Sequence, residues 1–304
     1  MSYDFRLYPE GDLYFVDERI ENPITFAHVA DLHLSPPSHD SYPKCYRPAI
    51  EWYDRRFGRP LKILPHLLDE ICDRGVDFVF FGGDNLDVYN SDSASLLKEM
   101  CIERGLKAYF LIGNHDWNDA HIRYVTNDCD LKKREIVTEK LLRKWGMPGR
   151  FYTFEHEGVR FIALDTPYIP VDDGHAGFFD ESQSIWFIDQ LLFDGPIVVF
   201  NHIPFLLPTF EPRLRKVFQG RNICIAEDRW GTMVRSAIEN NRAILGIFAA
   251  HLHFRSEDPL GRTWQFIVAP PQGGQWRYVK IANTNPPKSL RASGEPIVES
   301  SKLF

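Results

Sequence analysis

Five short runs of apolar residues, mostly β-branched or aromatic, recur along the chain, and polar residues follow each of them directly. The runs are ITFAHVA (24–30), VDFVFFG (76–82), KAYFLI (107–112), PIVVF (196–200) and AILGIFAA (243–250). Runs of this length and composition predict buried strands. Since α/β sheets place their sites outside the carboxyl ends of strands, the polar residues that follow are candidates for one shared site.

Helical periodicity separates these runs. Apolar residues recur at helical spacing between Leu61 and Asp73, and Gly75 follows as a helix stop. Three further helices are predicted on similar grounds: Ser93–Arg104 before Gly105, Leu131–Trp145 before Gly146, and Glu181–Phe193 after the N-cap Asp180. Strands that alternate with helices indicate an α/β layered fold.

Other segments predict antiparallel strands. Phe151–Glu155 and Val159–Leu164 flank Glu157-Gly158 and are typical of a hairpin. Residues 1–23 predict a hairpin or an edge strand, and Trp264–Ile281 adds further strands. We therefore expect mixed sheets.

The polar residues after the five runs are metal-ligand types in short islands. They are Asp31-Leu32-His33, Gly83-Asp84-Asn85-Leu86-Asp87, Gly113-Asn114-His115-Asp116, Asn201-His202 and His251-Leu252-His253. Each island alone is explained better by a turn or an ordinary histidine than by a metal site. Together they offer carboxylate, imidazole and amide oxygen, a set that suits Mn²⁺, Fe²⁺, Zn²⁺ or Ni²⁺ better than Ca²⁺.

The order of these islands resembles the blocks of the calcineurin-like metallophosphoesterases, DxH, GDxxD, GNH[DE], H and GHxH, over residues 24–255. Four blocks match, and Ala250 replaces the usual glycine of the last. The resemblance implies a four-layer α/β sandwich of two mixed β-sheets flanked by helices. Because the islands span most of the chain and must converge, we expect one domain over 1–283, with 1–23 as an edge extension and 284–304 as a flexible tail.

The resemblance also implies two divalent ions, most simply Mn²⁺ or Fe²⁺, with Zn²⁺ or Ni²⁺ as alternatives. One ion would be bound by Asp31, His33 and His253, the second by Asn114, His202 and His251, and Asp84 would bridge them. Two dications facing two carboxylates and a bridging hydroxide keep a positive surplus that attracts phosphate. The neutral amide of Asn114 preserves that surplus.

Two ions roughly 3.5–4 Å apart activate a bridging water and bind the phosphoryl oxygens. In the family pattern His115 is the general acid for the leaving oxygen, and Asp87 fixes its tautomer. Asp116 is expected to orient neighbouring groups rather than to bind metal. A homologue that keeps the ligands but has lost catalysis is the alternative, and the intact His115 and Asp87 argue against it.

The last residue of the second block and the two residues that follow it distinguish branches of the family. Asp87 stands where purple acid phosphatases carry a tyrosine, and Val88-Tyr89 stands where Ser/Thr protein phosphatases carry an arginine. Asn201-His202-Ile203-Pro204 is closer to phosphodiesterases of small substrates, such as cyclic nucleotides or glycerophosphodiesters. We expect such a phosphodiesterase. The alternatives are a phosphomonoesterase, a nucleotide or lipid pyrophosphatase, and a non-catalytic metal-stabilised scaffold.

Composition excludes several partners. The net charge is −7 and Lys132-Lys133-Arg134 is the longest basic run, so stable nucleic-acid binding is not expected and the partner is a small phosphate ester. No apolar stretch approaches the roughly 20 residues of a membrane span, and the amino-terminal residues lack a signal pattern. Five cysteines without a C-x-x-C pair favour a reduced, cytoplasmic protein, and the oligomeric state stays open.

Several candidates outside the islands keep two interpretations. Residues 34–60 form either a substrate-covering loop or a surface excursion, and 270–276 either stacks a ring on Trp276 or packs that side chain inside. Arg255 either reaches a phosphate oxygen or is solvated. Asp165 either orients the site or ends a strand, and three loop histidines are expected at the surface: His39, His121 and His175.

Overall fold

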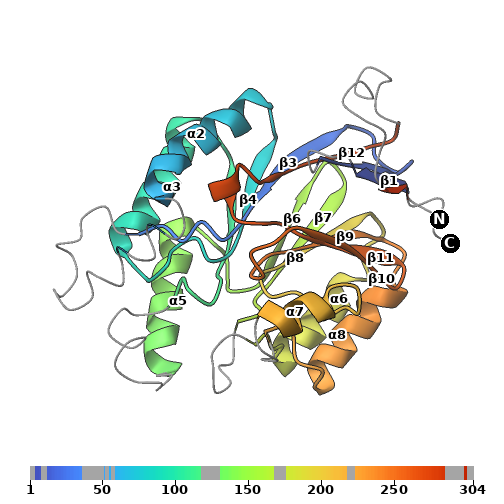
Figure 1. Cartoon of the computed structure of the whole chain (residues 1–304). Helices are drawn as coiled ribbons and strands as arrows, with labels where there is room; N and C mark the ends of the chain where they lie inside the picture. The colour runs from blue at the N-terminus through green and yellow to red at the C-terminus, as the bar shows by residue number, and fades with distance from the viewer. Residues whose placement is uncertain are drawn as a thin grey trace.

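Two mixed β-sheets packed face to face form the centre of the computed structural model (Figure 1). The structure describes residues 4–7, 12–35, 51, 55, 59–117, 131–167, 176–217, 223–284 and 298–299. Within this part of the chain, one sheet has seven strands and the other has six. Helices cover the outer face of each sheet, which confirms the four-layer sandwich.

The seven-stranded sheet has the order β13-β1-β2-β12-β3-β4-β5. Its strands are β1 (Asp4–Leu7), β2 (Leu13–Val16), β3 (Ile24–Val29), β4 (Phe78–Gly82), β5 (Ala108–Leu111), β12 (Arg277–Ala282) and β13 (Val298–Glu299). β3, β4 and β5 are parallel, β12 is antiparallel to β3, and β1 and β2 form the amino-terminal hairpin. β13 pairs with β1, while the remainder of the predicted 284–304 tail after Thr284 lies outside the described residues.

The six-stranded sheet has the order β10-β11-β9-β8-β7-β6. Its strands are β6 (Tyr152–His156), β7 (Val159–Leu164), β8 (Ile197–Asn201), β9 (Ile244–Ala249), β10 (Ser256–Leu260) and β11 (Thr263–Ile267). β7, β8, β9 and β11 are parallel, and the two edge strands run antiparallel to their neighbours. The chain therefore crosses from one sheet to the other between β11 and β12, which the periodicity of Trp264–Ile281 did not show.

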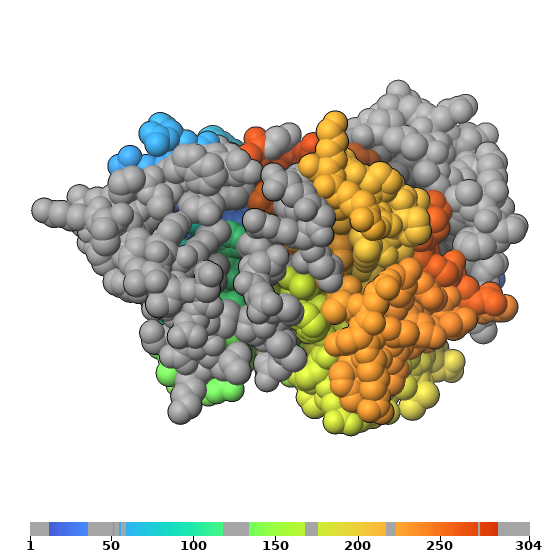
Figure 2. Space-filling view, turned by 60° about the horizontal axis from the view of Figure 1, so that its bottom comes forward, coloured from blue at the N-terminus to red at the C-terminus, as the bar shows by residue number. Residues whose placement is uncertain are grey.

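Each sheet carries its own helices (Figure 1). The seven-stranded sheet is covered by α2 (Pro60–Asp73), α3 (Ser91–Glu103) and α5 (Leu131–Trp145), and the six-stranded sheet by α6 (Glu181–Gln190), α7 (Glu211–Val217) and α8 (Arg229–Asn240). In Figure 2 the yellow and orange surface belongs mainly to this second group. A short 3₁₀ helix, η3 (Pro271–Gly273), precedes β12.

Phenylalanine rings fill the space between the sheets. Phe26 of β3 lies 5.8 Å from Phe161, 5.7 Å from Phe200 and 5.4 Å from Phe248 by ring centroids, all three from the opposite sheet. Edge-to-face contacts of this kind stabilise the interface beyond the apolar area that they bury. This apolar interface supports the sheet ends that carry the islands.

The predicted elements agree closely with the structure. The five strands begin and end within two residues of their predicted bounds, and the hairpin, α2, α3, α5 and the Asp180 cap of α6 are all present. The helices α7 and α8 were not predicted. α8 buries Val234 and Ile238 at a spacing of four residues behind the cap Asp228, so a helical signal was present in the sequence.

Candidate metal centre

The five islands meet at one edge, where the carboxyl ends of β3, β4, β5, β8 and β9 lie together. Of the non-glycine residues that the structure describes, seven have a positive φ, and five of these are predicted ligands: Asp31 (54°), His33 (48°), Asp84 (50°), His251 (70°) and His253 (55°). A side chain in this left-handed region costs of order 1–3 kcal/mol and persists where the surroundings fix it, which is typical of functional sites.

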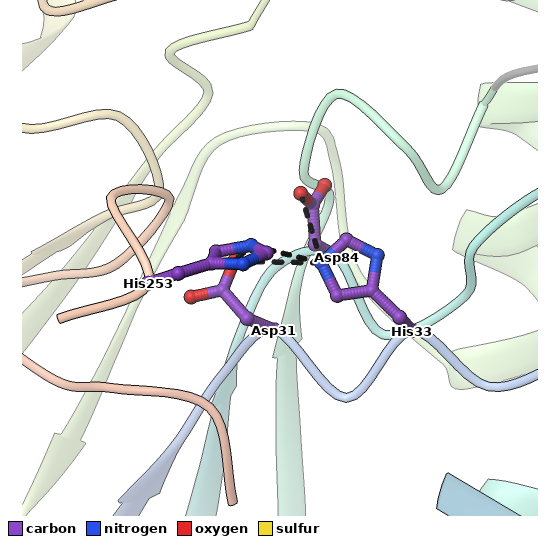
Figure 3. A group of neighbouring side chains, drawn as sticks. All are labelled: Asp31, His33, Asp84 and His253. Atoms are coloured by element: carbon purple, nitrogen blue, oxygen red, sulfur yellow. Dashed lines mark hydrogen bonds and ion pairs between the residues drawn. The ribbon is translucent and has the colours of Figure 1, made fainter. Parts of the chain in front are cut away.

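Four predicted ligands from three loops point toward one another: Asp31, His33, Asp84 and His253 (Figure 3). Nε2 of His33 lies 3.1 Å from Nε2 of His253 and 3.8 Å from Oδ2 of Asp84. Oδ1 of Asp31 lies 3.5 Å from Nε2 of His253 and 4.0 Å from that of His33. Atoms bound at about 2.1 Å to one ion are about 3 Å apart when adjacent and about 4.2 Å apart when opposite. The observed distances fit this geometry.

Asp84 also belongs to a second group, with His202 and His251. Its Oδ2 lies 3.3 Å from Nε2 of His202, whose Nδ1 lies 2.9 Å from the Gly82 carbonyl oxygen. Donation to that carbonyl places the proton on Nδ1 and directs Nε2 toward Asp84, as metal-binding imidazoles require. The carboxylate of Asp84 is therefore common to both groups.

Asn114 contributes an amide to the same edge. It is buried, and its Oδ1 has no hydrogen-bond partner among the described residues. The next backbone nitrogen, that of His115, donates to Oδ1 of Asp84 at 2.7 Å and so brings Asn114 beside the shared carboxylate. A buried carbonyl without a partner lowers the free energy of unfolding by about 1–3 kcal/mol, and a cation bound to the oxygen would remove this cost.

Two glycines let the loops approach. A Cβ at Gly83, whose φ is 97°, would lie 2.5 Å from Nδ1 of His202. A Cβ at Gly113 would collide with the backbone nitrogen and the carboxylate of Asp84. Both positions therefore require glycine for steric reasons.

His115 and Asp87, which the sequence predicts as a general acid and its partner, are in contact. Nδ1 of His115 lies 3.0 Å from Oδ1 of Asp87, and that same oxygen lies 3.5 Å from Nδ1 of His33. Asp87 thus contacts the candidate acid and a predicted ligand at once. Because Asp87 accepts at Nδ1, a proton on its way to substrate would be carried by Nε2.

Asp116 connects two of the loops. Its carboxylate accepts hydrogen bonds from the backbone nitrogens of Leu86 and Gly113, each at 2.7 Å, and from the side chain of Asn85 at 3.3 Å. Burial, and then the charge of Asp84, raise the pKa of Asp116 well above its ordinary value. Asp116 therefore joins the second island to the third and lies outside both ligand groups.

The site balances buried charges within the polypeptide alone. Burial opposes ionisation of Asp84, yet the imidazoles around it, His202 foremost, hold its pKa well below the ordinary value. Burial would lower the pKa of His202, but Asp84 raises it to about 9. Burial, and then the charge of His115, lower the pKa of His33 to about 4, so His33 is neutral as a metal ligand must be.

The structure also places the candidates outside the islands. Arg255 pairs with Glu257 at 2.7 Å, Asp165 pairs with Arg150 at 2.9 Å, and Trp276 is buried in the core. His39, His121 and His175 and nearly all of the 34–60 segment lie outside the described residues. Sequence reasoning missed the fully buried His28 and Arg277, which face each other on β3 and β12 beneath the site.

A family model decides the relationship. The model of the calcineurin-like phosphoesterases matches residues 24–255. The chain belongs to this family. No curated protein sequence matches the chain. Among the helices that the structure describes, none is long and apolar enough to cross a membrane.

Solved structures share the fold at low identity. A dimetal phosphatase from Danio rerio is 15% identical, with 82% of this chain and 88% of that chain covered and a TM-score of 0.50. A purple acid phosphatase from yellow lupin is 10% identical, with 87% of this chain and 47% of that chain covered and a TM-score of 0.51. These likenesses show the fold alone. Together, the family and the clustered Asp and His side chains point to a dinuclear metal site.

Proposed function

We propose that the chain is a phosphodiesterase that hydrolyses small phosphodiesters at a dinuclear metal centre. One observation carries the proposal: the Asp84 carboxylate is shared by two groups of metal-ligand side chains that come from both sheets. A carboxylate between two such groups suits a residue that bridges two ions. Membership of a phosphoesterase family supports a metal-dependent hydrolase of phosphate esters.

In this proposal each of the two groups binds one metal ion. Asp31, His33 and His253 bind one ion, and Asn114, His202 and His251 bind the other. Mn²⁺ and Fe²⁺ suit this nitrogen and oxygen donor set, as do Zn²⁺ and Ni²⁺. When bound, the ions supply Lewis acidity, a nucleophile at neutral pH and neutralisation of phosphoryl charge.

In this proposal the residues around the ligands protonate the leaving group and orient the general acid. His115, whose ring centroid lies 4.5 Å from that of His33, stands beside the first group and gives a proton to the leaving oxygen. Asp87 fixes the tautomer of His115 through its contact with Nδ1. The side chains of His115 and His253 are 11% and 30% exposed, whereas those of Asp31, His33, Asp84 and His202 are nearly inaccessible. Substrate therefore approaches past His115 and His253.

The side chains after the second island support a small diester over a phosphoprotein. Val88 is buried, and Tyr89 packs against the core that joins the sheets. Packed side chains therefore occupy the position at which Ser/Thr protein phosphatases carry an arginine, and no cation from this position faces the substrate. A small diester carries one negative charge at neutral pH, so it needs less positive charge around the metals than a monoester dianion does.

The decisive experiment compares two chromogenic esters. Metal-stripped protein is reloaded with Mn²⁺, its stoichiometry is measured by calorimetry, and turnover of bis-p-nitrophenyl phosphate is compared with that of p-nitrophenyl phosphate. Asp84→Ala serves as the blank, because it removes the shared carboxylate. We expect two Mn²⁺ per chain and a higher kcat/KM for the diester.

Each alternative gives a different result. Faster hydrolysis of the monoester would replace the phosphodiesterase by a phosphomonoesterase or pyrophosphatase. Two bound ions with no turnover of either ester would favour the scaffold. Failure to bind Mn²⁺, Fe²⁺, Zn²⁺ or Ni²⁺ would overturn the metal centre itself.

A further inference from the structure

Arg277 is a fully buried arginine that reaches from one sheet to the other. It lies on β12 of the seven-stranded sheet, opposite His28 of β3 and beside the inward-facing Val279. Its Nη2 donates to the carbonyl oxygen of Ile267 at 2.7 Å and to Oε1 of Glu257 at 2.5 Å, both in the six-stranded sheet.

These partners lie at the base of the loop that carries two predicted ligands. Ile267 is the last residue of β11 and pairs with Ala249, the last residue of β9, immediately before the His251–Arg255 loop. Glu257 is the second residue of β10, where that loop ends, and it also accepts from Arg255 of the loop at 2.7 Å. Arg277 therefore contacts the strand residue that pairs just before the His251–Arg255 loop and a residue just after the end of this loop.

Tyr152 makes the corresponding contact at the opposite side of the interface. It lies on β6 of the six-stranded sheet, and its hydroxyl donates to the carbonyl oxygen of Phe110 at 2.8 Å. The same hydroxyl accepts from the backbone nitrogen of Phe110 at 3.2 Å. Phe110 lies on the edge strand β5, whose end leads directly into Asn114 and His115.

The metal centre needs the two sheets in one relative position. Asp31, His33, Asp84 and Asn114 come from one sheet, and His202, His251 and His253 from the other. Contacts between phenylalanine rings occur over centroid separations of about 4.5–7 Å and so tolerate small sliding movements, whereas hydrogen bonds to a guanidinium or a phenol fix atoms within a few tenths of an ångström.

We infer that Arg277 and Tyr152 are positioning residues, which set the register of the two sheets so that the ligand groups close on both metal ions. The inference rests on the proposed dinuclear centre. Neither residue belongs to a group of candidate ligands. Each acts through the loop that it holds: Arg277 through His251 and His253, and Tyr152 through Asn114 and His115.

The test measures Mn²⁺ binding rather than activity alone. Parent, Arg277→Lys and Tyr152→Phe proteins are stripped and titrated with Mn²⁺ by calorimetry, and the spin coupling of the bound pair is followed by electron paramagnetic resonance. Tyr152→Phe removes one hydroxyl, and Arg277→Lys keeps the charge without the planar donor set. Leu68→Ala and Ile71→Val, at buried positions of α2, are controls that lower stability without removing a hydrogen bond between the sheets.

We expect about 10–100-fold weaker Mn²⁺ binding and an altered coupling signal in both variants, which is the range for residues that orient metal ligands. The α2 controls should retain parental affinity and signal after a similar loss of stability. Parental affinity and coupling in Tyr152→Phe and Arg277→Lys would overturn the inference, as would equal losses in the controls. A parent that binds no Mn²⁺ would instead contradict the proposed metal centre.

Discussion

Gly83→Ala tests whether the close approach of two loops builds the metal centre. An alanine Cβ at this position would lie 2.5 Å from Nδ1 and 2.8 Å from Cγ of His202. Unbonded atoms of these types normally stay about 3.5 Å apart. The imidazole of His202 must therefore move by about 1 Å, which breaks its 2.9 Å contact with the Gly82 carbonyl oxygen.

Two costs add in this variant. The backbone at Gly83 has a φ of 97°, and a side chain in a left-handed conformation costs of order 1–2 kcal/mol. Overpacking against a fixed neighbour adds roughly 1–3 kcal/mol. Gly105→Ala isolates the first cost, because Gly105 has a φ of 67° and nothing within 4 Å of an added Cβ. We therefore expect Gly83→Ala to lose about 1–3 kcal/mol more free energy of unfolding than Gly105→Ala.

The assay combines urea unfolding of metal-stripped protein with Mn²⁺ titration. A ligand displaced by about 1 Å should weaken the binding of one Mn²⁺ at least about tenfold in Gly83→Ala, while Gly105→Ala binds like the parent. The reasoning is refuted if Gly83→Ala is no less stable than Gly105→Ala and binds two Mn²⁺ with parental affinity.

Two further predictions concern protons. His115→Ala should lower kcat by about 10²–10⁴-fold for a diester with an alkoxide leaving group, and should leave Mn²⁺ affinity unchanged. The loss should be smaller for a diester that releases p-nitrophenolate, because this leaving group needs no proton. Equal losses of kcat for both esters would contradict the assignment of His115 as the general acid. In metal-free protein the pKa of His202 is raised from 6.5 to about 9, so the folded state binds more protons than the unfolded state between these pH values. The stabilisation is complete below pH 6.5 and is lost as the pH rises through about 9. Mn²⁺ affinity should rise over the same pH range, because the ion displaces the proton of His202. If neither the free energy of unfolding nor the Mn²⁺ affinity changed with pH, the pairing of His202 with Asp84 would be contradicted.

Local patterns predicted most of the elements, because hydrophobic period and capping residues are properties of neighbouring positions. The pairing of strands that are distant in the sequence could not be predicted from such local patterns. β11 and β12 are separated by nine residues, yet they belong to different sheets. The alternation of Arg277, Val279 and Ile281 indicates an inward face, but only the placement of the second sheet shows what the guanidinium contacts.

The residues of the candidate site could be predicted from the sequence, but most of the contacts between them could not. Order and residue type pointed to seven candidate ligands, and the structure brings six of them into two groups, with Asn114 beside the shared carboxylate. The second contact of Asp87, with His33, was not predicted, because it depends on how the first and second loops lie against each other. The same limit applies to Arg255, whose partner Glu257 could not be chosen over solvent from spacing alone.

The leucine inside each short ligand motif explains how strained ligands persist. Leu32 separates Asp31 from His33 and is buried in the larger core, which includes side chains of both sheets and of α2, α3 and α5, while Leu252 separates His251 from His253 and is buried in the core under α6 and α8. Burial of a leucine contributes about 1.5–3 kcal/mol, which is comparable to the 1–3 kcal/mol cost of one left-handed residue. Each motif has two such residues around one leucine. Burial therefore offsets only part of the strain, and hydrogen bonds such as the one that the backbone nitrogen of His251 donates to Oδ2 of Asp31 at 3.1 Å must offset the rest.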